Sequence, residues 1–215
     1  MAWEVWKHYY IGVDLGQKRD HTAVAVLEKA EVVFGERNRV SYERQREWRH
    51  SVRLLERMAL GTPYTEVAER LIRIARSDEM KHRCTMVLDA TGVGLPVVDL
   101  IKQKQPGCMV DAVVITGGDR CWQQEGVWRT PKKELIMGLV VMLETGRLKV
   151  ARGLEEAGTL VKELQGLRVK MSEAGRESFG AWREGEHDDL VLAVALAGWR
   201  AHNRRFWGLA ERPQV

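Results

Sequence analysis

The sequence predicts a mixed α/β fold, in which a sheet of three antiparallel strands followed by parallel strands is flanked by helices. Two observations carry this prediction. Near the start of the chain, short apolar runs are separated by polar turns, which is typical of antiparallel hairpins. Later apolar runs alternate with segments whose apolar residues recur at helical spacing, as parallel strands with helical crossovers require.

The first part of the chain supplies the antiparallel strands. Tyr9–Val13 is an apolar run that ends at Asp14, and after a polar turn Thr22–Leu27 resumes as an apolar, β-branched strand. A short turn between two such runs indicates a hairpin. We expect the third strand of the meander between Glu31 and about Tyr42.

Strands and helices then alternate. The further strands are expected at Cys84–Leu88, Met109–Ile115, Leu148–Val150 and Ser178–Trp182. The helices are expected at Tyr64–Ser77, Leu95–Gln105, Thr130–Glu144, Leu154–Leu167 and His187–Asn203. Pro131 favours the start of the third helix, because a helix tolerates proline in its first turn. The segment 117–129, which carries two tryptophans, is expected to be an exposed loop or a hairpin.

Length and composition bound the architecture. The 215 residues, 45% hydrophobic and 30% charged, predict one domain over residues 1–215, with a core at about 8–203 and a frayed tail at 204–215. This composition excludes low-complexity and fibrous proteins. No apolar stretch is long enough to cross a membrane and no signal peptide is visible, so we expect a cytoplasmic protein. Three widely spaced cysteines predict neither a disulfide framework nor a zinc site.

Four aspartates stand where a charge is costly. Asp14 and Asp89 each end an apolar strand, and the adjacent Asp188 and Asp189 begin an apolar helix. Taken singly, each has a structural explanation as a turn residue or a helix cap. If the first strand lies beside the strand that ends at Asp89, the carboxylates converge at one edge of the sheet. Such a cluster indicates a site for Mg²⁺ or Mn²⁺, which prefer hard oxygen ligands.

Three segments resemble the acidic motifs of the nuclease domain of phage terminase large subunits. They are Tyr10–Gly16 (YIGVDLG), Val87–Gly94 (VLDATGVG) and His187–Ala193 (HDDLVLA), and Pro131–Leu135 and Gly146–Leu148 are similar to the segments between the second and third motifs. The resemblance covers about residues 9 to 200. It implies a ribonuclease H-like fold and a metal-dependent endonuclease that cuts concatemeric viral DNA during packaging.

The resemblance also implies residue roles. Asp14 would bridge two Mg²⁺ or Mn²⁺ ions, Asp89 would hold one of them and Asp189 would be the third catalytic ligand. Neighbouring helical residues point about 100° apart, so Asp188 is expected to be a cap or an outer ligand. His187 either contacts metal or water or is polar surface. Lys132 or Lys133, near a helix N-terminus, would meet the scissile phosphate or lie on an exposed helix start.

Double-stranded DNA is the partner that the resemblance implies. The net charge is only +4, but the basic residues are concentrated in runs that are suited to binding DNA. Each run is either a solvated helix face or a DNA contact. The residues concerned are Arg44, Arg46, Arg49, Arg120 and Arg129.

No phosphate-binding G-x-x-x-x-G-K-[ST] loop is present in the sequence, whereas terminase large subunits carry a packaging ATPase. We therefore expect either an isolated nuclease domain or a stand-alone relative that works with a separate packaging ATPase, a small terminase subunit and a portal. Three alternatives remain open at this point. They are a nuclease resembling Holliday-junction resolvases, an ATPase resembling the actin-like and sugar-kinase proteins, and a non-catalytic DNA-binding or assembly subunit.

Overall fold

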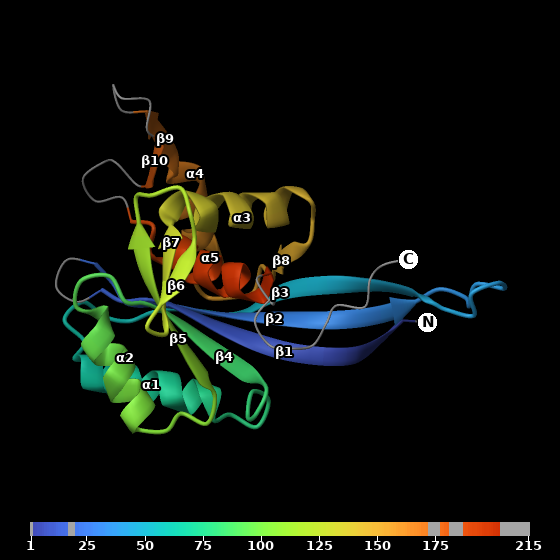
Figure 1. Cartoon of the computed structure of the whole chain (residues 1–215), viewed down its shortest axis with the longest axis horizontal. Helices are drawn as coiled ribbons and strands as arrows, with labels where there is room; N and C mark the ends of the chain where they lie inside the picture. The colour runs from blue at the N-terminus through green and yellow to red at the C-terminus, as the bar shows by residue number, and fades with distance from the viewer. Residues whose placement is uncertain (1, 17–19, 172–176, 181–186, 203–215) are drawn as a thin grey trace.

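An eight-stranded mixed sheet with helices on both faces is the framework of the computed structural model, which describes residues 2–16, 20–171, 177–180 and 187–202 (Figure 1). Its strands are β1 (Trp3–Asp14), β2 (Ala23–Phe34), β3 (Gln45–Arg57), β4 (Cys84–Asp89), β5 (Met109–Thr116), β6 (Trp122–Gln124), β7 (Val127–Pro131) and β8 (Leu148–Val150). The helices are α1 (Tyr64–Ala75), α2 (Gly94–Gln103), α3 (Lys132–Glu144), α4 (Ala157–Gly166) and α5 (Asp189–His202). A separate two-stranded hairpin consists of β9 (Arg168–Met171) and β10 (Glu177–Gly180).

The strand order in the sheet is β6-β7-β5-β4-β1-β2-β3-β8. The first three strands pair antiparallel, and β4, β5 and β7 extend the sheet from β1 in parallel. The predicted fold class is therefore confirmed. In this order β1 and β4 are neighbours at the middle of the sheet, where the chain turns to opposite sides after each strand. Such a position is where open α/β sheets place their sites.

The third strand was predicted in the wrong place. Residues 31–34 belong to β2, and the third strand is β3, which begins at Gln45. The polar pair Glu28 and Lys29 reads as the end of a strand, but both side chains are buried in the middle of β2. Glu28 forms ion pairs with Lys7 and Arg53, which offset the cost of burying its charge. The strand therefore continues through two charged residues.

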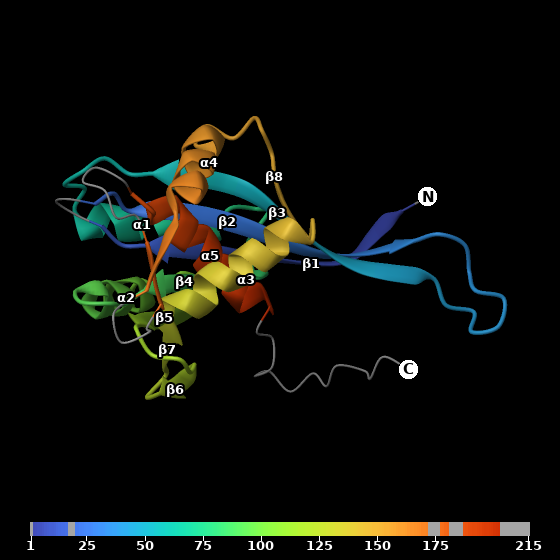
Figure 2. The same cartoon turned by 90° about the horizontal axis from the view of Figure 1, so that it is seen from above.

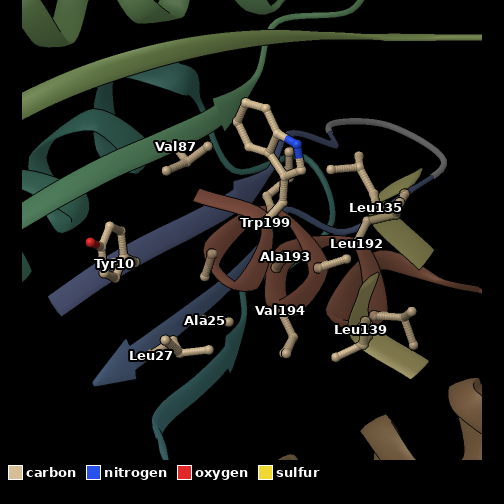
Figure 3. Packing of buried hydrophobic residues seen from close by; sticks show 14 of the residues in the cluster. Tyr10, Ala25, Leu27, Val87, Leu135, Leu139, Leu192, Ala193, Val194 and Trp199 are labelled. Atoms are coloured by element: carbon tan, nitrogen blue, oxygen red, sulfur yellow. The ribbon is translucent and has the colours of Figure 1, made fainter. Parts of the chain in front are cut away.

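Helix α5 crosses the middle of the sheet and forms the core of one face, together with α3 and α4 (Figures 1 and 2). Every residue from Asp189 to Ala201 is buried. Figure 3 shows Leu192, Ala193 and Val194 between the sheet and α3. A Cβ added at Gly12 would overlap the carbonyl oxygen of Ala193 and lie 2.8 Å from the Ala197 nitrogen, so glycine lets β1 and α5 touch backbone to backbone.

The opposite face is covered by α1 and α2 (Figure 1). Leu71 of α1 and Ile101 of α2 are fully buried against a sheet face that includes Ile11 and Met86. Both faces of the central strands are thus covered, which explains why β4 reads as a continuous apolar run.

The tryptophan-containing segment forms the hairpin of β6 and β7. Trp128 is buried and packs edge to face against Trp199 with ring centroids 5.5 Å apart, whereas Trp122 is exposed. Trp128 is therefore an anchor to the core. The expected last strand corresponds to β10, although residues 181 and 182 lie outside the described residues, as does the tail 204–215. Among the described residues, no helix has the length and apolar character needed to cross a membrane.

Candidate metal site

Asp14 and Asp89 end neighbouring parallel strands at the middle of the sheet. The register pairs Val13 with Leu88, so the two aspartates follow directly at the same edge. The Asp89 carboxylate accepts hydrogen bonds from the backbone N–H of Thr91, at 2.8 Å, and from the Thr91 hydroxyl. The Thr91 hydroxyl oxygen in turn accepts the N–H of Ile115, at 2.9 Å. The turn after β4 therefore fixes Asp89, and the convergence expected from the strand order is present.

The start of α5 brings Asp188 and Asp189 to the same edge. A pocket of about 300 Å³ opens there, and we call it the acidic pocket. Its lining residues are Asp14, Leu15, Gly16, Asp20, His187, Asp188, Asp189 and Leu192. Asp89 does not line this pocket, but it follows the strand residue next to Val13, and its negative charge raises the pKa of Asp14. Residues more than 170 positions apart in the chain are thus brought to one pocket.

Two cations contact the acidic pair at the start of α5. Lys132 Nζ, at the start of α3, donates to Asp188 Oδ2 at 2.7 Å. Arg57, the last residue of β3, donates to Asp189 Oδ2 at 3.4 Å, and its side chain is largely buried. Lys133 is exposed beside Lys132. Sequence reasoning missed Arg57, because it stands at the end of a run of arginines that gives no reason to single it out.

His187 lies at the pocket rather than on open surface. The ligand atoms of Asp20, His187 and Asp189 all lie within 4.8 Å of one another. His187 Nδ1 is 3.7 Å from Asp20 Oδ1 and 3.8 Å from Asp189 Oδ2. Asp20 belongs to the polar turn between β1 and β2, and it was not among the predicted site residues. Its signal in the sequence is weak, since turns commonly contain aspartate.

Burial and mutual repulsion oppose ionisation of these carboxyl groups. Burial raises the pKa of Asp14 well above its usual range, and the charges of Asp89, Asp189 and Asp188 raise it further. Burial also raises the pKa of Asp89, although hydrogen bonds from Thr91 oppose this. The pKa of Asp189 is raised by burial, against the lowering effect of His187 and Arg57. A cluster whose charges destabilise one another in this way is suited to a divalent cation.

Glu163 is a further carboxylate near the acidic pocket that sequence reasoning missed. It lies on α4, is 7% exposed and accepts the N–H groups of Leu190 at 2.9 Å and Val191 at 3.1 Å. Burial raises its pKa to about 7. A signal was available, because Glu163 stands on the apolar side of its helix, three residues after the buried Leu160.

These shifts predict that the metal-free protein loses stability as pH rises. A carboxyl group with a raised pKa favours the folded state while it is protonated, so its contribution is complete below the unfolded pKa and lost above the folded one. For Glu163 the contribution is lost between about pH 4.5, the ordinary pKa of a glutamate, and its raised pKa of about 7. At about 1.4 kcal/mol per pKa unit, it corresponds to on the order of 3 kcal/mol. Asp14, Asp89 and Asp189 act in the same direction.

Urea unfolding in EDTA between about pH 4 and pH 8 measures this effect. The free energy of unfolding should fall with pH, and Glu163→Gln should show a shallower fall because its amide does not titrate. A wild-type stability that rises over this interval, or an equal slope in the variant, would contradict the assigned shifts.

The arginines expected to bind DNA lie in two places. Arg46 and Arg49 are near the start of β3, and eight residues of extended strand place Arg49 about 26 Å from Arg57 at the site. Figures 1 and 2 show this end of β3 projecting beyond the helices. Arg46 pairs with Glu31 at 3.0 Å, Arg49 pairs with Glu47, and Arg44 stacks over Trp3. These arginines are on or beside a strand, so the alternative of a helix face is wrong for them.

The other two arginines belong to the β6–β7 region. Arg120 is exposed before β6, and the partly buried Arg129 is on β7, two residues before Pro131. Since β7 runs parallel to β5 and β4, its end points to the same edge of the sheet as Asp89. Arg129 is thus nearer the acidic pocket in the sheet than Arg46 or Arg49. Its contact with DNA stays a prediction.

The chain matches no protein-family model and no curated protein. Similarity appears at the level of structure. The large terminase nuclease of thermophilic phage G20c, with bound magnesium, superposes with a TM-score of 0.62 at 23% identity, over 90% of this chain and 82% of that one.

Two further solved structures are similar. A mutant nuclease domain of the large terminase subunit gp2 of bacterial virus Sf6, with manganese and β-thujaplicinol, has a TM-score of 0.59 at 15% identity, over 89% of this chain and 87% of that one. The large terminase nuclease domain of bacteriophage SPP1, with bound manganese, has a TM-score of 0.52 at 10% identity, over 90% of this chain and 86% of that one. Identities this low establish likeness of fold. The chain therefore has the ribonuclease H-like fold of the large terminase nuclease domains, as its three acidic motifs predicted.

Proposed function

We propose that the protein is a metal-dependent DNA endonuclease that cleaves concatemeric viral DNA during genome packaging. The observation that carries this proposal is the convergence of Asp14, Asp188 and Asp189 on one pocket, with Asp89 at the end of the neighbouring strand. This convergence occurs in a chain with the fold of terminase nuclease domains that were solved with magnesium or manganese.

The donor set fits Mg²⁺ or Mn²⁺. Carboxylate oxygens predominate, His187 adds an imidazole nitrogen, and the raised pKa values of Asp14, Asp89 and Asp189 mark a place where added positive charge is favourable. On this proposal Asp14, Asp89 and Asp189 hold two ions, and Asp188 is an outer ligand. Asp20 and His187 form a second group of ligands around Asp189 within the same pocket.

Bound metal would supply a nucleophilic water and stabilise the leaving oxygen of the phosphodiester. Other side chains of the protein orient the acidic ligands and balance their negative charge. Thr91 keeps the Asp89 carboxylate in one orientation through two hydrogen bonds. Lys132, at the start of α3, is close enough to the pocket to exchange its bond with Asp188 for a phosphate oxygen of the substrate. Arg57 limits the negative charge around Asp189.

We further propose double-stranded DNA as the substrate, bound mainly through its phosphates. Residues 1–215 would act as one nuclease domain in the cytoplasm, with a separate packaging ATPase, a small terminase subunit and a portal as partners. A resolvase-like nuclease and a non-catalytic DNA-binding subunit are the alternatives that the assay below separates from this proposal.

Incubation of purified protein with supercoiled plasmid tests the proposal. We expect nicked and linear products with Mn²⁺ or Mg²⁺ and none in EDTA, and cleavage should weaken as salt rises, because phosphate contacts release counterions. A parallel reaction on a four-way junction measures structure-specific cutting. Absence of cleavage with both ions would contradict the endonuclease proposal, and preferential cutting of the junction would favour the resolvase alternative.

A further inference from the structure

Glu163 joins α4 to the beginning of α5, the helix that carries the acidic pair. Its Oε2 accepts two backbone N–H groups, from Leu190 at 2.9 Å and from Val191 at 3.1 Å. Its Oε1 is buried and has no hydrogen-bond partner among the residues that the structure describes. Oε2 thus accepts two hydrogen bonds, whereas Oε1 accepts none from the described residues. The carboxylate therefore binds the start of α5 and is not part of a wider polar network there.

The start of α5 requires such an acceptor. The first N–H groups of a helix have no partner within it, and an aspartate in the preceding position normally accepts one of them through its side chain. Asp188 has that position in α5, since its carbonyl oxygen accepts the N–H of Leu192. Its carboxylate, however, accepts a hydrogen bond from Lys132 Nζ at 2.7 Å and lines the acidic pocket. The capping role therefore falls to Glu163, from another helix.

We propose that Glu163 is a positioning residue that caps α5 in place of Asp188 and thereby keeps the carboxylates of Asp188 and Asp189 at the acidic pocket. This inference rests on the proposed function in one respect, namely that the pocket binds Mg²⁺ or Mn²⁺. Without Glu163, the N–H groups of Leu190 and Val191 are left buried and unpaired. The acceptor nearest to them along the chain is the Asp188 side chain, and its rotation toward them would draw it away from Lys132 and the pocket.

Three variants test this role. Glu163→Ala removes the acceptor, and Glu163→Gln retains one amide oxygen for the two N–H groups. Leu160→Ala removes a buried side chain from α4, one turn before Glu163, and is the control for lost packing without a lost cap. For each variant we would measure the Mn²⁺ concentration that gives half-maximal DNA cleavage, the maximal rate, the Mn²⁺ dissociation constant by calorimetry and the Tm.

Glu163→Ala is expected to raise the half-activating Mn²⁺ concentration and the Mn²⁺ dissociation constant about tenfold, the scale seen when a residue that orients a metal ligand is lost. The maximal rate at saturating Mn²⁺ should change much less. Glu163→Gln should keep both Mn²⁺ values near those of wild type. Leu160→Ala should lower Tm without moving either value.

The inference is overturned if Glu163→Ala binds Mn²⁺ like wild type, or if Leu160→Ala weakens Mn²⁺ binding as much as Glu163→Ala does. The proposed function fails separately if the wild-type protein binds Mn²⁺ without cutting DNA, and the calorimetric comparison of variants then still decides the role of Glu163. A wild-type protein that neither binds Mn²⁺ nor cuts DNA would overturn both.

Discussion

Asp14→Asn is expected to reduce Mn²⁺-dependent DNA cleavage at least about a thousandfold while leaving the protein folded. Asp14 lines the acidic pocket and ends the strand beside that of Asp89, so on the proposed function its carboxylate would be shared by the bound ions. Replacing an anionic oxygen with an amide removes a charge that divalent cations require. Asp89→Asn should have an effect of similar size, since the Thr91 hydrogen bonds aim its carboxylate at the same place.

Stability separates this effect from unfolding. Burial raises the pKa of Asp14 because it disfavours the charged carboxylate, and an asparagine carries no such charge. Asp14→Asn should therefore have a Tm in EDTA equal to or above that of wild type, and lose the rise in Tm that Mn²⁺ gives the wild type. Asp99→Asn, on the exposed side of α2, is the matched control and should cut normally. Retained cleavage in Asp14→Asn would contradict the site assignment.

Gly12→Ala is expected to destabilise the fold by at least about 3 kcal/mol, a large effect for one methyl group. The added Cβ would overlap the Ala193 carbonyl oxygen and lie 2.8 Å from the Ala197 nitrogen. Both atoms belong to the backbone of α5, so no side chain can rotate to make room. The helix would have to shift, and the acidic pair at its start would shift with it. Cleavage should fall in the fraction that still folds.

Gly138→Ala provides the comparison for Gly12→Ala. Gly138 is exposed on α3, and a Cβ added there meets no atom within 4 Å. Alanine favours the helix over glycine, so this variant should gain up to about 1 kcal/mol. Urea unfolding of both variants measures the difference. A Gly12→Ala variant as stable as wild type would mean that β1 and α5 are not in the close contact described above.

The acidic site was largely predictable because its residues interrupt strong apolar patterns. Asp14 and Asp89 end buried strands, and the Asp188–Asp189 pair begins the most apolar helix. A charged residue in such surroundings can be recognised from the sequence alone. Their convergence followed from the strand order, since a parallel strand after a meander can lie beside the first strand, as β4 does beside β1.

The missed features depend on pairs that are distant in sequence. Strand β2 continues through Glu28 because this residue forms ion pairs with residues of β1 and β3. In the sequence alone, Glu28 and Lys29 look like the polar residues of a turn. Arg57 is 132 positions from its partner Asp189, and Glu163 reaches backbone groups 27 and 28 positions away. A single sequence contains these residues but does not state their partners, because tertiary packing decides which buried charges meet.

The position of α5 in the chain has a consequence for synthesis. The carboxylates of Asp14 and Asp89 leave the ribosome early, but the helix with the remaining acidic pair comes last among the described elements of the fold and also fills the middle of one core. At about 5–20 residues per second, roughly 5–20 s separate the end of β4 from α5. During that interval the sheet lacks the helix that fills the middle of one face, and the set of carboxylates is incomplete. Acquisition of the fold and assembly of the acidic pocket are thus tied to the same late event, and a chain that stops before α5 gains neither.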